Sequence, residues 1–180
     1  MLKSNLFLPL LIVIGCFFVG SAHAQTAAKQ ADAKPSSMRT AKEGVGIEGL
    51  IVGKSTMADV IKKFGKGYKW NVHKKYSFSM TYPDLGLAFY MCQSDQKKQI
   101  FDIEMREPFK VKTAKGIVLG SSTVADIERI YGKSKDGLEY KGVNFYYANR
   151  KGKKIVTVID IIEPEGIRQC KEATAAPVKK

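Results

Sequence analysis

The sequence contains little of what metal centres are usually built from. Its 180 residues include 2 histidines and 3 cysteines, and no two cysteines have the Cys-x-x-Cys spacing of a zinc site. Acidic residues are also scarce, with 17 Asp and Glu against 30 Lys and Arg, which gives a formal net charge of +13. The composition therefore predicts no metal and no other cofactor, and it indicates a basic surface that suits anionic partners.

Long apolar runs are absent except at the N-terminus, where residues 6–19 are almost entirely apolar. This run is shorter than the roughly 20 residues of a membrane span, and the small residues of Ala22-His23-Ala24 follow it. The pattern is typical of a secretory signal peptide over residues 1–24, cleaved after Ala24. We expect a periplasmic or secreted protein with no transmembrane segment in the mature chain. Cleavage at Cys16, as in a lipoprotein, is the alternative.

Export changes how the charge and the cysteines are interpreted. In a cytosolic protein, the positive charge would suggest binding to nucleic acid. We expect no nucleic-acid partner for an exported protein. If Cys16 leaves with the signal peptide, Cys92 and Cys170 remain as an even pair in an oxidising compartment. This predicts a disulfide that ties a C-terminal extension, residues 166–180, to the body of the protein. The alternative, two unpaired buried thiols, stays open because the sequence does not give the distance between them.

Residues 25–45 have almost no large apolar side chains and are rich in Ala, Lys, Gln, Ser and Thr. Such a segment buries too little surface to offset the entropy lost on ordering. We therefore predict a disordered linker over residues 25–45.

A motif that occurs twice organises the rest of the chain. Gly53-Lys54-Ser55-Thr56-Met57-Ala58-Asp59-Val60 recurs as Gly120-Ser121-Ser122-Thr123-Val124-Ala125-Asp126-Ile127, and Gly65 and Gly132 follow at the same spacing. Self-similarity of this kind predicts a repeated structural unit. In each copy a Thr three residues before an Asp favours a helix N-cap, and the later glycine favours the helix end.

After each predicted helix the apolar period changes from about 3.6 to 2, which indicates strands. In the first copy we expect strands near residues 76–82, 85–91 and 100–106, and the pairing of Gly86 with Gly142 carries the same pattern into the second copy. We predict an α+β fold made of two repeats, residues 46–110 and 111–165. Each repeat is a helix plus a three-stranded antiparallel meander, with the helices on one face of a curved sheet. The first repeat also has a longer connection between helix and sheet.

The alternation along these strands predicts a binding surface on the face turned away from the helices. Its predicted partner-binding residues are Tyr90, Tyr146, Glu104, Asp160, Arg106, Asn144 and Trp70. Tyrosine and arginine are common at the centres of protein interfaces, because they offer a large contact area. The alternative is that the tyrosines only cover a solvated sheet.

The pattern Gly-x-Ser-Thr-x-x-Asp-Val-x-x-x-Phe-Gly, duplicated behind a signal peptide and leading into a meander, resembles the family of the beta-lactamase inhibitory protein. It also looks like the outer-membrane assembly lipoproteins of the SmpA/OmlA type, which carry one such unit. The resemblance covers residues 47–164 and implies a concave sheet face that grips a partner protein. The four half-cystines of that inhibitor are not reproduced here, and none of its inhibitory residues carries over, so beta-lactamase as a target stays open.

An enzyme is not predicted. Ser55, Ser122, Asp59 and Asp126 are explained by helix capping at two equivalent places, and Glu104 and Asp160 have no accompanying pair of nucleophile and base. We therefore expect a non-enzymatic protein-binding module, of inhibitor type, whose partner is a secreted or envelope protein. The alternative is a structural or assembly protein of the cell envelope that touches anionic lipid or cell wall through basic segments.

Overall fold

The computed structural model of the protein describes residues 37–74, 76–135, 137–164 and 170. The predicted signal peptide lies outside the described residues, as do residues 25–36 of the predicted linker and all of the C-terminal extension except Cys170.

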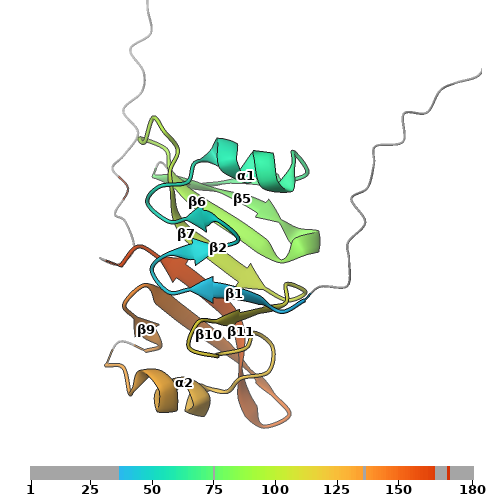
Figure 1. Ribbon diagram of the computed structural model, residues 1–180, viewed down its shortest axis with the longest axis vertical. Helices are drawn as coiled ribbons and strands as arrows, with labels where there is room; N and C mark the ends of the chain where they lie inside the picture. Colours follow the sequence, from blue (N-terminus) through green and yellow to red (C-terminus); the bar gives the residue numbers. More distant parts are fainter. Residues whose placement is uncertain (1–36, 75, 136, 165–169, 171–180) are drawn as a thin grey trace, which may run out of the picture. The chain divides into compact units, whose positions relative to one another are not determined.

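The described residues form two β-sheets and two short helices (Figure 1). The larger sheet has seven strands in the order β4 (Lys69–His73), β5 (Ser77–Tyr82), β6 (Leu87–Cys92), β7 (Ile100–Arg106), β11 (Lys153–Ile162), β10 (Val143–Arg150) and β9 (Glu139–Tyr140). The small sheet has four strands in the order β3 (Leu50–Ile51), β2 (Gly46–Ile47), β1 (Arg39–Lys42) and β8 (Val111–Thr113). The helices are α1 (Met57–Phe64) and α2 (Val124–Tyr131), and a 3-10 turn, η1, spans Pro83–Leu85.

All neighbouring strands of the larger sheet are antiparallel. Its centre is the pair β7 and β11, in which Ile103 lies opposite Ile161 and Met105 lies opposite Ile159. Since β7 closes the first repeat and β11 closes the second, this pair joins the two repeats into one continuous sheet.

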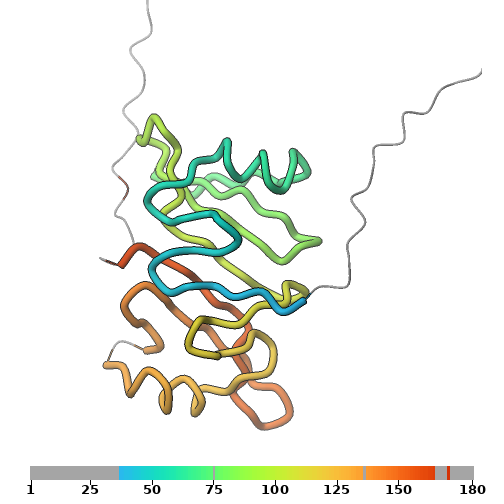
Figure 2. The backbone as a smooth tube through the Cα atoms, viewed as in Figure 1, coloured from blue at the N-terminus to red at the C-terminus, as the bar shows by residue number. Residues whose placement is uncertain are grey.

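One face of the larger sheet carries the hydrophobic core. We call this the inner face, because α1, α2 and the small sheet all pack on it (Figure 1). Val60 of α1, Ile127 of α2 and Ala41 of β1 are fully buried in the same cluster as Phe89 and Ile103 of the larger sheet. Figure 2 shows the blue N-terminal segment passing between the two helices.

The prediction of an α+β fold made of two helix-plus-meander repeats is wrong. Strand dominates the described residues, which form sheets of four and seven strands and contain two α-helices. The prediction missed the small sheet because its strands have two to four residues each, too few to show a period. The small sheet is also built from distant segments, since β1 pairs in parallel with β8.

The linker prediction extended too far, because residues 39–42 form β1 and Ala41 is fully buried. The helices, in contrast, begin and end as predicted. Thr56 and Thr123 are the N-caps, with Asp59 and Asp126 accepting hydrogen bonds from their backbone N–H groups at 2.8 and 2.9 Å.

Gly86, which follows η1, allows β6 and β7 to approach closely. It has φ 71°, and a Cβ atom there would lie 2.2 Å from the carbonyl oxygen of Arg106. Gly152, at the tip of the β10–β11 hairpin, has a similar φ of 78°, but a Cβ atom there would meet nothing within 4 Å. The two glycines therefore share a backbone conformation and differ in the space around them.

We predict that Gly86→Ala destabilises the protein by about 2 kcal/mol more than Gly152→Ala does, because backbone strain is common to both and the clash is not. Urea unfolding of both variants measures the difference. Equal losses of unfolding free energy would contradict the close approach of β6 and β7 at this turn.

Candidate functional site

The face opposite the core, which we call the outer face, carries six of the seven predicted partner-binding residues. In the strand register, Glu104 lies opposite Asp160, and Asp160 lies opposite Asn144. Residues that lie opposite each other in antiparallel strands project to the same side of the sheet. The same register places Tyr90, Tyr146 and Arg106 on this side. The outer face therefore brings together side chains from both repeats.

The structure does not bring Trp70 to the outer face. Trp70 lies opposite Met80, which is buried in the core, so its side chain projects to the inner side of the sheet. Its ring stacks on Phe78 with 4.1 Å between centroids. The sequence places Trp70 in the longer connection between helix and sheet of the first repeat. It does not give the register of β4 against β5, which decides to which side of the sheet the Trp70 side chain projects.

Two carboxyl groups at the centre of the outer face are buried. Asp102 is 9% exposed and Asp160 is 5% exposed. One oxygen atom of each, Oδ1, makes no hydrogen bond with any described residue. A buried carboxylate without a partner is costly, so these groups are not explained by folding alone. The prediction had not included Asp102 among the site residues, although the alternation placed it on this face.

Burial raises the pKa of Asp102 to about 7, and the negative charge of nearby Glu104 adds to the effect. Burial likewise raises the pKa of Asp160 to about 8, with further contributions from Asp102 and then Glu104, while the Arg106 guanidinium acts in the opposite direction. Near neutral pH Asp102 and Asp160 are therefore only partly ionised.

Glu104 is paired with a hydroxyl and a guanidinium group, and Asp160 also has a hydrogen bond with the Tyr146 side chain. The Tyr90 hydroxyl donates to Glu104 Oε2 at 3.3 Å, and Arg106 Nε forms an ion pair with Glu104 Oε1. Burial, followed by the charge of Glu104, raises the pKa of Tyr90, so this hydroxyl keeps its proton and remains a donor. The Tyr146 side chain is 49% exposed and offers its ring to solvent beside the cluster.

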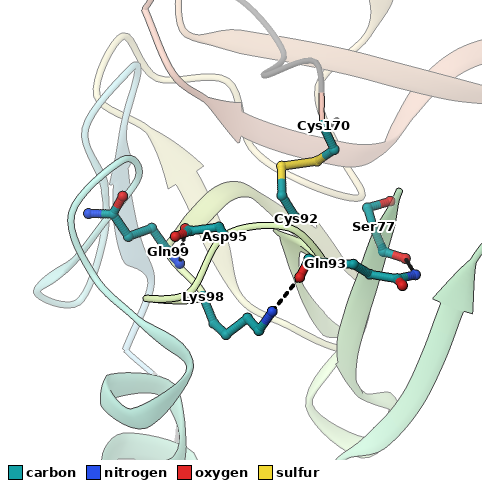
Figure 3. The surroundings of a disulfide bond; sticks show 7 residues. All are labelled: Ser77, Cys92, Gln93, Asp95, Lys98, Gln99 and Cys170. Atoms are coloured by element: carbon teal, nitrogen blue, oxygen red, sulfur yellow. Dashed lines mark hydrogen bonds between the residues drawn. A yellow bond between two sulfur atoms is a disulfide. The ribbon is translucent and has the colours of Figure 1, made fainter. Parts of the chain in front are cut away.

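A disulfide lies at one end of the outer face (Figure 3). Cys92 lies opposite Ser77 at the end of β6 and bonds to Cys170, with 5.2 Å between the Cα atoms. The neighbouring turn is held by Gln93, whose side-chain amide donates to the carbonyl oxygens of Lys74 and Ser77, and by Lys98, which donates to the Gln93 carbonyl. The bond attaches Cys170, from the predicted extension, next to the outer face.

The serines and aspartates of the repeated motif have local structural partners. Ser55 Oγ accepts from the Ile51 N–H, and Ser122 Oγ accepts from the Val118 N–H, both at 2.9 Å. The Thr123 backbone N–H, then its hydroxyl and then Arg129 lower the pKa of Asp126 to about 2. These contacts agree with turn and capping roles.

Comparison with known proteins finds no family model, no curated protein and no solved structure that matches the chain. Among the described residues, no helix has the length and apolar character needed to cross a membrane. Over the same ranges, no three His, Cys, Asp or Glu side chains are grouped so that they could hold a metal ion.

The raised pKa values of Asp102 and Asp160 predict how stability depends on pH. Because both lie above the usual 3.8, the folded state binds more protons than the unfolded chain between about pH 4 and pH 8, and stability falls as pH rises through this window. We predict that Asp160→Asn raises the unfolding free energy by about 2 kcal/mol near pH 9 and changes it little near pH 4. Thermal unfolding across this range measures the effect.

Asp126→Asn is the matched control, because its folded pKa is lowered rather than raised. This variant should be less stable than the parent at neutral pH, and the difference should vanish as pH falls toward 2. If Asp160→Asn showed the same pH profile as Asp126→Asn, the buried carboxyl pair would not have the protonation described above.

The disulfide closes a loop with a sequence separation of 78. We predict that Cys170→Ser lowers the unfolding free energy by about 2–4 kcal/mol, because the unfolded chain regains loop entropy. Denaturant unfolding with and without reductant measures this, and the Cys92→Ser/Cys170→Ser variant should not respond to the reductant. Two titratable thiols at these positions in unreduced, denatured protein would contradict the bond.

Proposed function

We propose that the protein is an exported, non-enzymatic protein-binding module, of inhibitor type, that uses the outer face of its seven-stranded sheet. The observation that carries the proposal is the convergence of Tyr90, Tyr146, Glu104, Arg106 and Asp160, from strands of both repeats, on one face. Aromatic and arginine side chains beside charged groups are the usual composition of an interface centre.

The carboxyl groups indicate the chemistry of the partner. The protein is strongly basic overall, yet this face gathers Asp102, Glu104 and Asp160, and two carboxyl oxygens there have no partner among the described residues. A Lys or Arg side chain of a secreted or envelope protein would compensate these charges, and Tyr146 would stack on a guanidinium or ammonium group. The resemblance of the duplicated motif to the beta-lactamase inhibitory protein family supports the same role and leaves the target open.

We predict that Tyr90→Ala/Tyr146→Ala abolishes retention of a partner from periplasmic and secreted extracts, because it removes both aromatic surfaces of the interface centre. Tyr147→Ala is the control. Tyr147 adjoins Tyr146 but lies opposite Val156, a core residue, so this change leaves the outer face intact. Mass spectrometry of the retained proteins gives the result.

Retention of the same protein by the double variant and by the parent would overturn the outer-face proposal. Circular dichroism of each variant should accompany the experiment, because Tyr90 is half-buried and packs on Phe101, with 6.4 Å between ring centroids. A folded double variant that fails to retain the partner is the expected outcome.

A second candidate is an envelope protein that contacts anionic lipid or cell wall. The tip of the β10–β11 hairpin favours it, because Arg150, Lys151, Lys153 and Lys154 are all exposed there. Such a contact should weaken steeply as salt rises from about 0.01 M to 0.1 M, since the Debye length falls from about 30 to 10 Å. A tyrosine-centred interface should weaken less, so a salt series on the retained material separates the two candidates.

A further inference from the structure

Strand β4 is the main departure of the first repeat from the second. The matched pairs Gly86 with Gly142 and Ile103 with Ile159 show that β6 and β7 correspond in sequence to β10 and β11. The longer connection of the first repeat forms β4, for which the second repeat has no counterpart. The repeated motif of the sequence therefore does not account for β4.

β4 is an edge strand whose free side is accessible. It pairs with β5, and no other described strand lies beside it. All five of its residues are exposed. Two of them, Trp70 and Val72, are apolar and project to the inner side, with exposed fractions of 47% and 60%. Unpaired backbone groups beside exposed apolar side chains form a template for a further strand.

A groove runs along the inner side of this edge. It has a volume of about 260 Å³ and is lined by Trp70, Val72, Phe78, Gln93 and Lys98. Its floor is ordered by neighbouring contacts, because Trp70 stacks on Phe78 and the Lys98 ammonium lies 5.8 Å from the Phe78 ring centroid. The groove is therefore formed before any ligand binds, and it suits aliphatic side chains.

The charge of this region selects among possible occupants. Residues 65–82 contain four lysines and no acidic residue. A second copy of the chain, paired antiparallel about Asn71, would bring a second set of these lysines to the same edge, which like charges disfavour. An acidic strand has the complementary charge.

We propose that β4 accepts an extended acidic segment of a partner protein as an additional strand of the sheet. Aliphatic side chains of this segment, two residues apart, lie beside Trp70 and Val72 and fill the groove. Its acidic side chains lie on the other side of the sheet, opposite Lys69 and His73. The groove lies on the inner side of the sheet, whereas the cluster of Asp102, Glu104 and Asp160 lies on the outer side, so the proposal does not depend on the function proposed above. The two surfaces adjoin at His73, whose ring centroid lies 5.5 Å from that of Tyr90.

Trp70 makes the proposal directly measurable, because it is the one tryptophan of the chain. The probe is a capped peptide with the sequence Ser-Glu-Val-Thr-Val-Glu-Ser, which matches the side-chain alternation of β4. We expect a saturable change in tryptophan fluorescence on titration. A peptide with Lys in place of Glu should bind at least about tenfold more weakly, because it meets like charge. An acidic peptide with N-methylated valines should also lose binding, because it cannot complete the strand pairing.

Two variants test the surface, each with a matched control. Val72→Thr keeps the shape and strand preference of the side chain but removes its apolar surface, and Lys69→Glu reverses the charge. Each should weaken binding of the acidic peptide by about tenfold. The controls are Val45→Thr, at an exposed valine outside the groove, and Lys112→Glu, at an exposed lysine of β8. Neither should change the affinity.

Several outcomes would overturn the proposal. No fluorescence change, or equal binding of the N-methylated peptide, would show that β4 does not accept a strand. A concentration-dependent fluorescence shift without peptide, with dimers in sedimentation equilibrium, would show that a second copy occupies the edge. Equal responses to anionic phosphatidylglycerol vesicles and to the acidic peptide would show that the region binds negative charge without recognising a strand.

Discussion

The pairing of β7 with β11 is the interaction on which the rest of the structure depends. On the inner face it sets Ile103 against Ile161 and Met105 against Ile159, which places buried side chains of both repeats in one core. On the outer face the same register sets Glu104 against Asp160. A shift of one residue would exchange the two faces of β11. The core and the candidate site are therefore consequences of one register.

The outer face combines features that oppose stability. Asp102 and Asp160 are buried close to Glu104, and burial together with mutual repulsion raises the pKa of both aspartates. Apolar residues of similar size would cost the fold less. The protein nevertheless keeps these groups at the centre of a surface, next to exposed Tyr146. The polar cluster and the core are separated only by the thickness of one sheet.

The two repeats are equivalent where they build the core and different where they meet solvent at the sheet edges. Both helices are capped by Thr and Asp in the same way, and both contribute one fully buried residue to the core. The first repeat ends in the exposed strand β4, whereas the sheet ends at the other side in the two-residue β9. The lengthened connection of the first repeat thus ends the sheet in a longer exposed strand than the other side has.

The sequence by itself determined the local features. The capping pairs, the glycines that end the helices and the alternation along β5, β6, β10 and β11 act between residues close in the chain, so their patterns are visible in it. Tertiary structure decided the small sheet, the burial of Asp102 and the side of the sheet on which Trp70 lies. These depend on pairings between distant segments, such as β1 with β8. Strand register and packing decide which distant segments pair. A pattern of apolar and polar residues within one segment does not show this pairing.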